Sequence, residues 1–376
     1  MAITNIIHGT NGNDNLTGED VANGGDLINA FAGDDTLFGN AGNDDLIGGE
    51  GNDLVFGGQG NDLLRGADKG RDSDLLAGGS EIDTATYGEV QHGMEVDLVV
   101  GRAQALNPAL RGPVDALISI ENVNGTAFDD SLAGNSGANS LGGFSGNDKL
   151  FGGEGNDVLH GGPDLGSDSD TLDGGFGIDT ATYAQVGHGM FINLFQGLAS
   201  GQGNVDFLTS IENITGTNFD DTITGDLNAN IVLGEAGNDR IDTSSGNDSL
   251  FGGAGNDILI GGAGKDILSG SSGADKFVFK LATDSANGLG NRDLVSGFVH
   301  NVDDLDLSQI DAKPGAIGNQ AFTFIAGSKF SAEGQVRFFF EGDHTVVALN
   351  TIGTGGAESQ IELAGNISLA AADFVL

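Results

Sequence analysis

The feature that most constrains this chain is a repeat of nine residues. Its first run places aspartates nine positions apart, at Asp26, Asp35, Asp44, Asp53 and Asp62. A glycine stands two positions before each of them, at Gly24, Gly33, Gly42, Gly51 and Gly60. An apolar residue follows each aspartate two positions on, at Ile28, Leu37, Leu46, Val55 and Leu64. So short a fixed period predicts a solenoid, in which each coil repeats the same turn and strand and stacks on its neighbours.

The register is recovered after every interruption. Asp14 belongs to a single earlier copy, and small insertions displace Asp74 and Asp170. The two later runs comprise Asp130, Asn139, Asp148 and Asp157, then Asp221, Asn230, Asp239, Asp248, Asp257, Asp266 and Asp275. Their glycines are Gly146, Gly155, Gly237, Gly246, Gly255 and Gly264. A disordered acidic tail needs no such register, so the pattern favours an ordered fold.

Each position of the repeat has a local physical role. Glycine turns sharply because it has no Cβ to clash at positive φ, and the Asn before many of the aspartates is expected to tolerate the left-handed region. The three residues after the turn form a short strand whose middle side chain points inward. Because that side chain stacks on its equivalents in neighbouring coils, the sequence predicts a thin apolar core.

The segments GGEGNDLVF, GGEGNDVLH and GGAGNDILI resemble the nonapeptide GGxGxDxUx of the RTX (repeats-in-toxin) family, where U is a large apolar residue. The resemblance implies an all-β fold, a right-handed parallel β-roll with a C-terminal β cap. Two nonapeptides complete one coil in that family, so aspartates eighteen positions apart should stack. The expected pairs are Asp26 with Asp44, Asp35 with Asp53, Asp44 with Asp62, Asp239 with Asp257, Asp248 with Asp266, and Asp257 with Asp275.

The resemblance also implies that the chain holds several Ca²⁺ ions, with the aspartates, asparagines and glycines named above as ligands. Carboxylate and carbonyl oxygens suit this hard cation, whereas Mg²⁺ tends to keep its waters. The net charge of -41 fits cationic partners and excludes nucleic acid and anionic membranes, which require clusters of Lys and Arg. Cysteine is absent, so disulfides cannot stabilise the weak core and bound metal is the remaining candidate.

Two longer segments interrupt the repeats and are copies of one another. They begin IDTATYGEVQHGM at Ile82 and IDTATYAQVGHGM at Ile178, and alternating apolar residues predict added strands. We expect structural coils there, although Tyr87, Tyr183, His92 and His188 leave a glycan-binding surface open. In the small insertions, Asp72 and Asp168 are either solvated acidic side chains or additional calcium ligands. The expected division is a first roll (1–81), an insertion (82–124), a second roll (125–177), a second insertion (178–215), a third roll (216–275) and a cap (276–376).

The C-terminal stretches GADKFVFK and IELAGNISLAAADFVL resemble the end of serralysin-type RTX proteins. Phe277 and Phe279 are expected to seal the last coil, which would otherwise expose apolar residues. Asp373, Phe374, Val375 and Leu376 match the shape of the uncleaved signal that the type I secretion apparatus reads. Because the opening residues MAITNIIHGTNGND lack a basic segment followed by an apolar stretch, we expect no N-terminal signal peptide. The expected location is extracellular, with cell-surface association left open.

No catalytic residue is predicted. The six histidines never form a pair four apart with an intervening glutamate, and no Gly-x-Ser-x-Gly motif occurs. Nearly all acidic residues belong to the repeat. We therefore expect a secreted calcium-binding protein with a role in adhesion, matrix or surface association, and extracellular polysaccharide as a candidate partner. The alternative is a glycan-active enzyme, or a detached targeting portion of an RTX exoenzyme.

Overall fold

The computed structural model describes residues 3–19, 24–66, 72–110, 112, 114–163, 168–288, 290–353 and 356–376. The chain divides into two compact units. Unit 1 comprises Met1–Thr182 with Gly203–Ile211, and unit 2 comprises Tyr183–Gln202 with Glu212–Leu376. In the described residues the secondary structure is β-strand except for one 3-10 turn, η1 (Ala371–Asp373).

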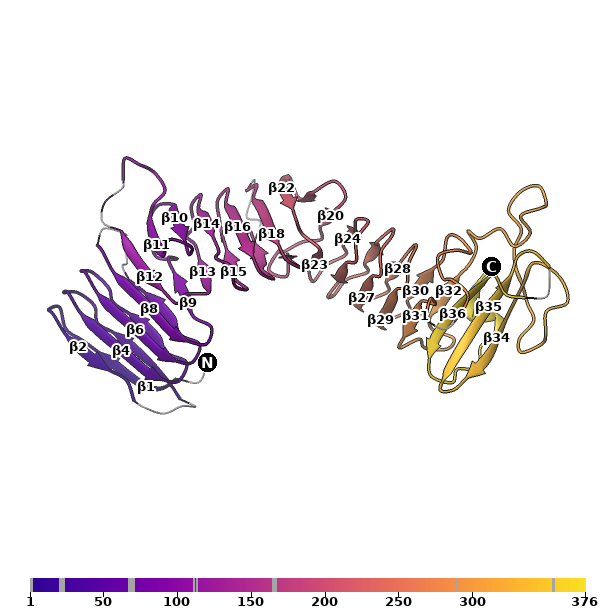
Figure 1. Cartoon of the computed structure of the whole chain (residues 1–376), viewed down its shortest axis with the longest axis horizontal. Helices are drawn as coiled ribbons and strands as arrows, with labels where there is room; N and C mark the ends of the chain where they lie inside the picture. The colour runs from indigo at the N-terminus through magenta and orange to yellow at the C-terminus, as the bar shows by residue number, and fades with distance from the viewer. Residues whose placement is uncertain are drawn as a thin grey trace. The chain divides into compact units, whose positions relative to one another are not determined.

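Each unit contains two sheets, and the chain alternates between them as it winds. In unit 1, sheet A contains β1 (Ile3–His8), β3 (Gly25–Asn29), β5 (Asp45–Ile47), β7 (Leu63–Arg65), β9 (Thr84–Thr86), β13 (Asn122–Asn124), β15 (Ser140–Gly142), β17 (Val158–His160) and β19 (Thr180–Thr182). Sheet B of unit 1 contains β2 (Asn15–Thr17), β4 (Thr36–Ala41), β6 (Leu54–Gln59), β8 (Leu75–Ser80), β10 (Met94–Asp97), β11 (Arg102–Ala105), β12 (Asp115–Ile118), β14 (Ser131–Ala133), β16 (Lys149–Glu154), β18 (Thr171–Phe176) and β22 (Asn204–Thr209). Strands β2, β4, β6 and β8 lie side by side in parallel (Figure 1).

Unit 2 follows the same plan. Its sheet A contains β23 (Asn213–Thr215), β25 (Ile231–Leu233), β27 (Ser249–Ala254), β29 (Ile267–Ser272), β31 (Leu294–Ser296), β33 (Thr323–Phe324), β34 (Gln335–Glu341), β35 (His344–Asn350) and β36 (Ser359–Ala364). Its sheet B contains β20 (Phe191–Asn193), β21 (Leu198–Gly201), β24 (Thr222–Thr224), β26 (Arg240–Asp242), β28 (Ile258–Ile260), β30 (Lys276–Val278), β32 (Asp304–Asp306) and β37 (Phe374–Val375).

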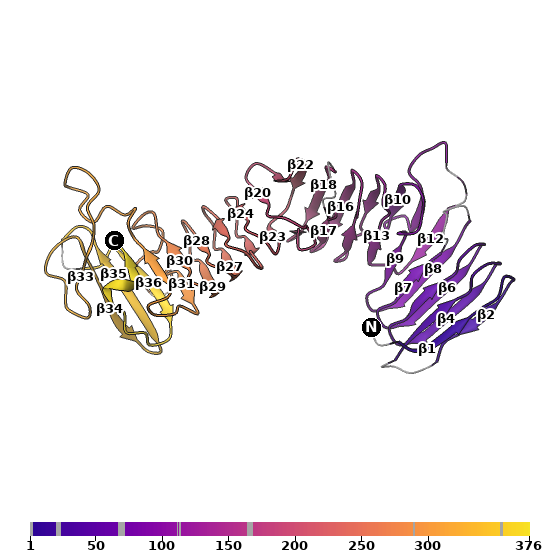
Figure 2. The ribbon, with the colours of Figure 1, turned by 180° about the vertical axis from the view of Figure 1, so that it is seen from behind.

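The parallel registers build the thin core that the repeat predicts. In sheet A, Ile28 pairs with Leu46 and Leu46 with Leu64, which are steps of eighteen residues. In sheet B, Leu37 pairs with Val55. All five side chains are fully buried, so one apolar residue per strand fills the space between the sheets. The parallel β-roll is therefore confirmed; β7 and β9 of sheet A are seen from behind in Figure 2.

The turns depend on glycine but use asparagine differently from our prediction. Gly33, Gly42 and Gly51 have φ of 129°, 132° and 133°, a region that L side chains rarely adopt. The asparagines before the aspartates are not among the residues with positive φ. Instead they form a ladder, because the backbone N–H of Asn61 donates to Oδ1 of Asn43 at 3.0 Å in the neighbouring coil. The asparagine side chains therefore serve as hydrogen-bond acceptors between coils, and their backbones do not adopt positive φ.

The first inserted segment contributes β10, β11 and β12 to sheet B between its sheet A strands β9 and β13. Strand β12 pairs in parallel with β8, then antiparallel with β11, while β11 pairs with β10 and β10 runs parallel to β14. In sheet A, β9 pairs directly with β13. The insertion thus supplies the added strands that alternating apolar residues predict. The boundary between the two units falls inside the second insertion, because β22 pairs with the preceding β18 whereas β20 pairs with the following β24.

The strands of the C-terminal region continue the two sheets of the roll in unit 2. Strand β30 still belongs to the roll, since it pairs in parallel with β28 and β32. Strand β36 continues sheet A from β31, and β37 continues sheet B from β32. Phe277 and Phe279, which were expected to seal the last coil, are both buried.

Candidate calcium sites

The repeat aspartates form columns in which each carboxylate contacts the preceding coil. Oδ1 of Asp44 accepts the backbone N–H of Asp26 at 2.7 Å, and Oδ1 of Asp62 accepts that of Asp44 at 2.8 Å. The pairs Asp35 with Asp53, Asp239 with Asp257, Asp248 with Asp266, and Asp257 with Asp275 repeat the contact at 2.8 to 3.0 Å. All six predicted stackings are confirmed. Because each bond crosses from one coil to the next, a column of carboxylates runs along each side of the roll.

The second carboxylate oxygen of most of these aspartates is buried and has no hydrogen-bond partner. This holds for Oδ2 of Asp35, Asp44, Asp53, Asp62, Asp74, Asp148, Asp157, Asp239, Asp257 and Asp266. The side chains themselves are at most 3 % exposed. Burying an ionised carboxylate without a compensating partner is strongly unfavourable. The columns therefore require either protons or cations.

Glycine makes room for these oxygens and places a carbonyl beside them. A Cβ added to Gly39 would lie 2.3 Å from Oδ2 of Asp44 and 2.5 Å from the carbonyl oxygen of Gly57. A Cβ on Gly234 would likewise lie 2.4 Å from Oδ2 of Asp239 and 2.5 Å from the Gly252 carbonyl. At both positions a side chain larger than hydrogen would collide with the carboxylate. The space brings a carboxylate oxygen and a main-chain oxygen of the next coil together.

Burial and neighbouring carboxylates raise the pKa values of the column aspartates. Burial, with added repulsion from Asp115 and Asp53, raises the pKa of Asp74 to about 8. The same causes raise the pKa of Asp62 to about 7 and those of Asp148 and Asp239 to about 8. Hydrogen bonds from the preceding coil oppose these shifts but do not cancel them. In the absence of cations, the folded columns therefore hold protons near neutral pH.

The family model of the RTX calcium-binding nonapeptide repeat matches the chain at 3–26, 29–64, 124–159, 142–181, 209–241 and 242–277. The chain belongs to the RTX family. RTX repeats bind multiple Ca²⁺ ions, so this RTX chain is a calcium-binding protein. Proteins with such repeats are typically secreted. Among the described residues, no helix is long and apolar enough to cross a membrane.

Three solved structures illustrate what the RTX chain is similar to. The R3 subunit of the Azotobacter vinelandii mannuronan C5-epimerase AlgE6 is 29% identical, covering 42% of this chain and 78% of its own, with a TM-score of 0.22. The R2 subunit of the same enzyme is 24% identical, covering 43% and 91%, with a TM-score of 0.24. The extracellular lipase LipA of Serratia marcescens is 19% identical, covering 66% and 40%, with a TM-score of 0.23. The search of curated proteins finds no match.

The donor set of the columns fits calcium. All its atoms are oxygens, from buried carboxylates and from main-chain carbonyls such as that of Gly57, which is the set that a hard cation of this size prefers. Among the described residues no three carboxylate, histidine or cysteine side chains converge, so main-chain oxygens must contribute to each site. Asp35, Asp44, Asp53, Asp62, Asp74, Asp148, Asp157, Asp239, Asp257 and Asp266 would hold the ions. A bound Ca²⁺ would neutralise the negative charge of these buried carboxylates.

Some predicted ligands differ from this pattern because a threonine already serves the carboxylate. Oδ2 of Asp130 accepts the backbone N–H of Thr126 at 2.6 Å, and Oδ1 accepts the Thr126 hydroxyl at 3.1 Å. Asp221 and Thr217 repeat both bonds. At the start of the roll, Oδ2 of Asp14 accepts the hydroxyl of Thr10. Because both oxygens of Asp130 and Asp221, and Oδ2 of Asp14, already accept hydrogen bonds from threonine, these three are weaker candidates than the aspartates whose Oδ2 has no donor.

The two asparagines predicted as ligands make hydrogen bonds to backbone groups. Nδ2 of Asn139 donates to the Glu121 carbonyl at 2.6 Å, and its Oδ1 accepts the N–H of Asn135 at 2.7 Å. Nδ2 of Asn230 donates to the Glu212 carbonyl at 2.8 Å. A neutral amide with both ends satisfied has no charge to compensate. Asn139 and Asn230 thus offer a neutral amide where the other repeats place a carboxylate, and their role as ligands stays a prediction.

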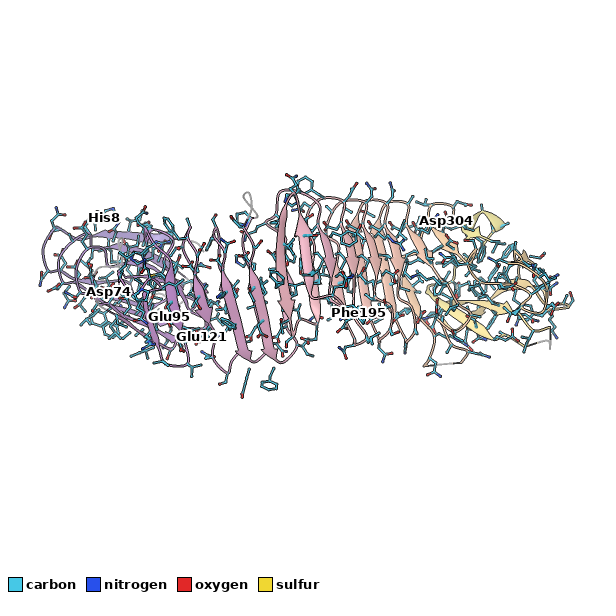
Figure 3. The ribbon with its side chains drawn as sticks, turned by 90° about the horizontal axis from the view of Figure 1, so that it is seen from above. His8, Asp74, Glu95, Glu121, Phe195 and Asp304 are labelled. Carbon is cyan, nitrogen blue, oxygen red and sulfur yellow. The ribbon has the colours of Figure 1, made fainter. Side chains whose placement is uncertain are left out.

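The structure adds column members that the sequence did not indicate to us. The backbone N–H of Asp74 donates to Asp115, and that of Asp83 donates to Glu121 at 2.9 Å; Asp74 and Glu121 are marked in Figure 3. In unit 2, Asp266 and Asp275 donate to Asp293 and Asp303. Asp83 stands nine positions after Asp74, so the period could have revealed it. Gly33 and its equivalents with positive φ shape the turn, whereas other glycines, such as Gly39 and Gly234, face a carboxylate.

The remaining residues singled out in the sequence have mixed positions. Tyr87 and Tyr183 are each only 3 % exposed, so neither can form part of a glycan-binding surface. His92 and His188 are half-buried. Of the two acids at the small insertions, Asp72 accepts the backbone N–H of Gly51, whereas Asp168 lies on a pocket wall. The C-terminal Asp373 is fully buried, and its carboxylate accepts the Nδ1–H of His300 at 2.8 Å.

Proposed function

We propose that this RTX chain is an exported protein whose calcium columns act as a folding switch, and that its folded roll associates with a cell surface or extracellular matrix. The observation that carries the proposal is the row of buried, unpaired carboxylate oxygens. Without cations these buried carboxylates must either take up protons or repel one another across adjacent coils. With cations each coil is held to the next, and the thin core can form.

The energetics favour a switch rather than a static scaffold. Extracellular calcium modules bind at roughly 10⁻⁴ to 10⁻³ M, and a site at tenfold excess contributes about 1.4 kcal/mol to folding. The ten buried aspartates named above each retain an oxygen without a hydrogen-bond partner, so the summed contribution is comparable to the stability of an ordinary domain. At micromolar calcium almost none of this stabilisation remains. The chain would thus cross a type I secretion channel unfolded and fold outside the cell.

The C-terminal signal proposed from Asp373, Phe374, Val375 and Leu376 fits this order of events. Asp373 accepts the backbone N–H groups of Asn301 and Ala370 at 2.8 and 2.6 Å, and β37 pairs with β32 of the roll. These residues are incorporated into the folded sheet. Recognition of the signal by the secretion apparatus would therefore precede folding.

A calcium titration of the full chain tests the switch. Far-ultraviolet circular dichroism should show little β-structure in excess chelator and a cooperative gain between about 10⁻⁴ and 10⁻³ M free calcium. Calorimetry on the same samples should count several ions. Full β-structure in chelator at pH 8 would refute the proposal, and so would a gain in structure with no ions bound.

A further inference from the structure

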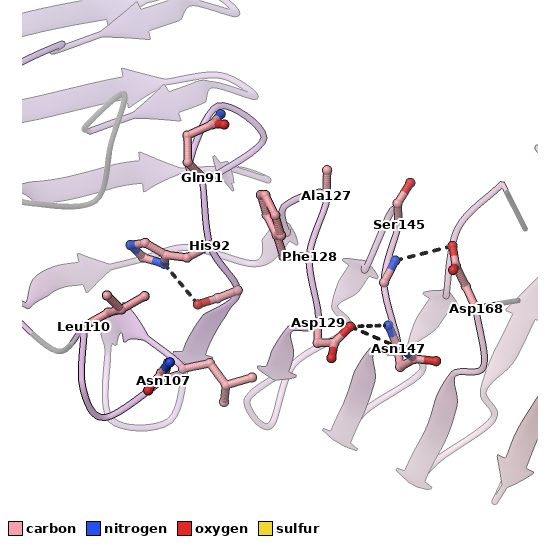
Figure 4. Close-up of a pocket in the computed structure, with 13 residues that line it drawn as sticks. Gln91, His92, Asn107, Leu110, Ala127, Phe128, Asp129, Ser145, Asn147 and Asp168 are labelled. Atoms are coloured by element: carbon pink, nitrogen blue, oxygen red, sulfur yellow. Dashed lines mark hydrogen bonds between the residues drawn. The ribbon is translucent and has the colours of Figure 1, made fainter. Parts of the chain in front are cut away.

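The first insertion forms the wall of a pocket that the calcium columns do not use. This cavity in unit 1 has a volume of about 680 Å³, and Figure 4 shows its lining. Its walls come from the insertion and from the turns of the following coils. The lining residues used below are His92, Asn107, Leu110, Phe128, Asp129 and Asn147. A volume of this size is within the range of small-ligand sites.

The loop between β11 and β12 builds one wall. Its residues Asn107, Pro108, Ala109 and Leu110 form a turn in which the N–H of Leu110 donates to the Asn107 carbonyl at 2.9 Å. Oδ1 of Asn107 also accepts the N–H of Ala109 at 3.0 Å. Proline as second residue and asparagine as first are the residues such a turn favours. The turn thus fixes the Asn107 side chain through Oδ1. The Nδ2 group of Asn107 makes no hydrogen bond to another described residue.

The opposite wall presents an aromatic ring that packing does not account for. Phe128 is 42% exposed, although its backbone is fixed through two contacts with the Thr126 hydroxyl at 3.0 and 3.2 Å. Leu110 is also half exposed at 51%. A well-anchored backbone that carries an exposed ring offers a flat apolar face at low entropic cost.

The polar groups of the pocket mostly accept hydrogen bonds. Nδ1 of His92 lies 3.2 Å from the Gly93 carbonyl and must donate to it, which leaves Nε2 of the neutral ring as an acceptor. Oδ1 of Asp129 accepts the backbone N–H of Asn147 at 2.9 Å, so Oδ2 remains for a ligand. No lysine or arginine is present among the described residues of the lining. A carboxylate, sulfate or phosphate ligand would have no cation to pair with in a chain of net charge -41.

We propose that this pocket binds a neutral, hydroxyl-rich carbohydrate. Hydroxyl groups would donate to His92 Nε2 and Asp129 Oδ2 and accept from Asn107 Nδ2, while the apolar face of a sugar ring packs on Phe128 and Leu110. The inference rests on the proposed surface-associated function and names the ligand class for it. Amines could also donate to these acceptors, but they would leave the Asn107 donor without a partner.

The second insertion provides an internal comparison in unit 2. His188, Phe219, Asp220 and Asn238 repeat the residue types, and Asn238 donates its backbone N–H to Asp220 at 2.7 Å. Phe219 is 46% exposed. Residues 106–114 join β11 to β12, however, whereas only residues 202–203 join β21 to β22. The second copy thus has the ring and the acceptors but lacks the loop that carries Asn107 and Leu110.

Calorimetry on the full chain, folded in excess calcium, tests the proposal. The probes are neutral hexasaccharides of glucose, mannose and galactose, with an oligouronate and oligolysine as charged comparators. We expect at least one neutral probe to bind. F128A and N107D should each raise the Kd for that probe by about tenfold or more. N107D keeps an oxygen that can accept the Ala109 N–H, removes the Nδ2 donor and adds one negative charge. F219A, the matched change in the second copy, should leave the Kd unchanged.

Circular dichroism and calcium counting on each variant separate this proposal from the folding switch. If the wild-type chain folds with calcium and none of the neutral probes binds, the carbohydrate site is wrong while the switch stands. Binding of oligolysine alone, or equal losses from F128A and F219A, would also overturn it. A variant that no longer folds with calcium is replaced by Leu110→Ser, which changes only an exposed side chain and should weaken binding in the same direction.

Discussion

At the scale of single residues, the calcium columns depend on a division of labour between the two oxygens of one carboxylate. Oδ1 of Asp53 accepts the backbone N–H of Asp35 at 2.8 Å and fixes the side chain. Its Oδ2 is buried with no donor. The first oxygen positions the second, so the coil spacing and the cation site are set by the same side chain.

Adjacent aspartates allow a matched test of this division. Asp35 is 1% exposed, whereas its neighbour Asp34 is exposed and accepts the backbone N–H of Asn52 at 2.9 Å. D35N removes one buried charge and should lower the calcium count by about one ion, with a loss of about 1.4 kcal/mol at tenfold calcium excess. D34N keeps an acceptor that asparagine provides at the same position in other repeats. Calorimetric counts that fall equally in both variants would contradict the assignment.

A second prediction concerns the glycine that faces the carboxylate. G39A would place a Cβ 2.3 Å from Oδ2 of Asp44, so either the turn or the carboxylate must move. We expect a loss of about 1 to 3 kcal/mol in calcium-loaded stability, the usual cost of overpacking. G12A is the control, because a Cβ there meets nothing within 4 Å. Urea unfolding in excess calcium measures both, and equal midpoints for the two variants would show that the space has no role.

At the scale of strands and turns, the sequence predicts the stacked aspartate pairs only where each coil has the same number of residues. The period identifies Asp44 and Asp62 because one coil takes eighteen residues there. Asp293 accepts the N–H of Asp266 across twenty-seven residues, and Asp303 accepts that of Asp275 across twenty-eight. A column needs only an acceptor in the next coil, whatever the length of chain between. Counting residues therefore fails wherever a coil is lengthened.

What a residue at a repeat position contacts also depends on its neighbours in the adjacent coil. Asn139 occupies an aspartate position in the correct register, so its inclusion among the ligands followed from the pattern. Only the structure shows that its Nδ2 reaches the Glu121 carbonyl. The exposed ring of Phe128 and the loop at Asn107 also form a pocket through folding that no local pattern indicates. Packing between coils, rather than propensity within them, decides these features.

The C-terminal strand gives a prediction at the same scale. Asp373 accepts N–H groups from His300, Asn301 and Ala370, so D373A would leave three donors without their partner. We expect a loss of about 3 kcal/mol or more in the stability of this end of the roll. Hydrogen exchange of β37 and β32 in excess calcium measures it. D343A changes a side chain that is 95% exposed and should leave exchange at wild-type rates; protection unaltered in D373A would contradict the role of Asp373.

For the chain as a whole, protons and calcium compete for the same oxygens. The charge of -41 opposes compaction of each unit, and the column aspartates concentrate part of that charge in buried positions. Burial raises the pKa values of Asp53 and Asp257 to about 6, of Asp266 to about 7 and of Asp148 to about 8. The ordinary aspartate value in the unfolded chain is 3.8. The folded chain without calcium therefore binds more protons than the unfolded chain between these values.

That difference fixes the sign of the pH dependence. Without calcium, the stabilisation from protonated columns is fully present below about pH 4 and is lost as the pH rises through 6 to 8. Circular dichroism in chelator should thus show more β-structure at pH 4 than at pH 8. In calcium the direction reverses, since protons displace the ion, and the half-saturating calcium concentration should rise as the pH falls from 8 to 5. Because D34N leaves the buried columns intact, it should follow the wild-type curve in both conditions. If calcium binding were independent of pH over this interval, buried carboxylates could not be its principal ligands.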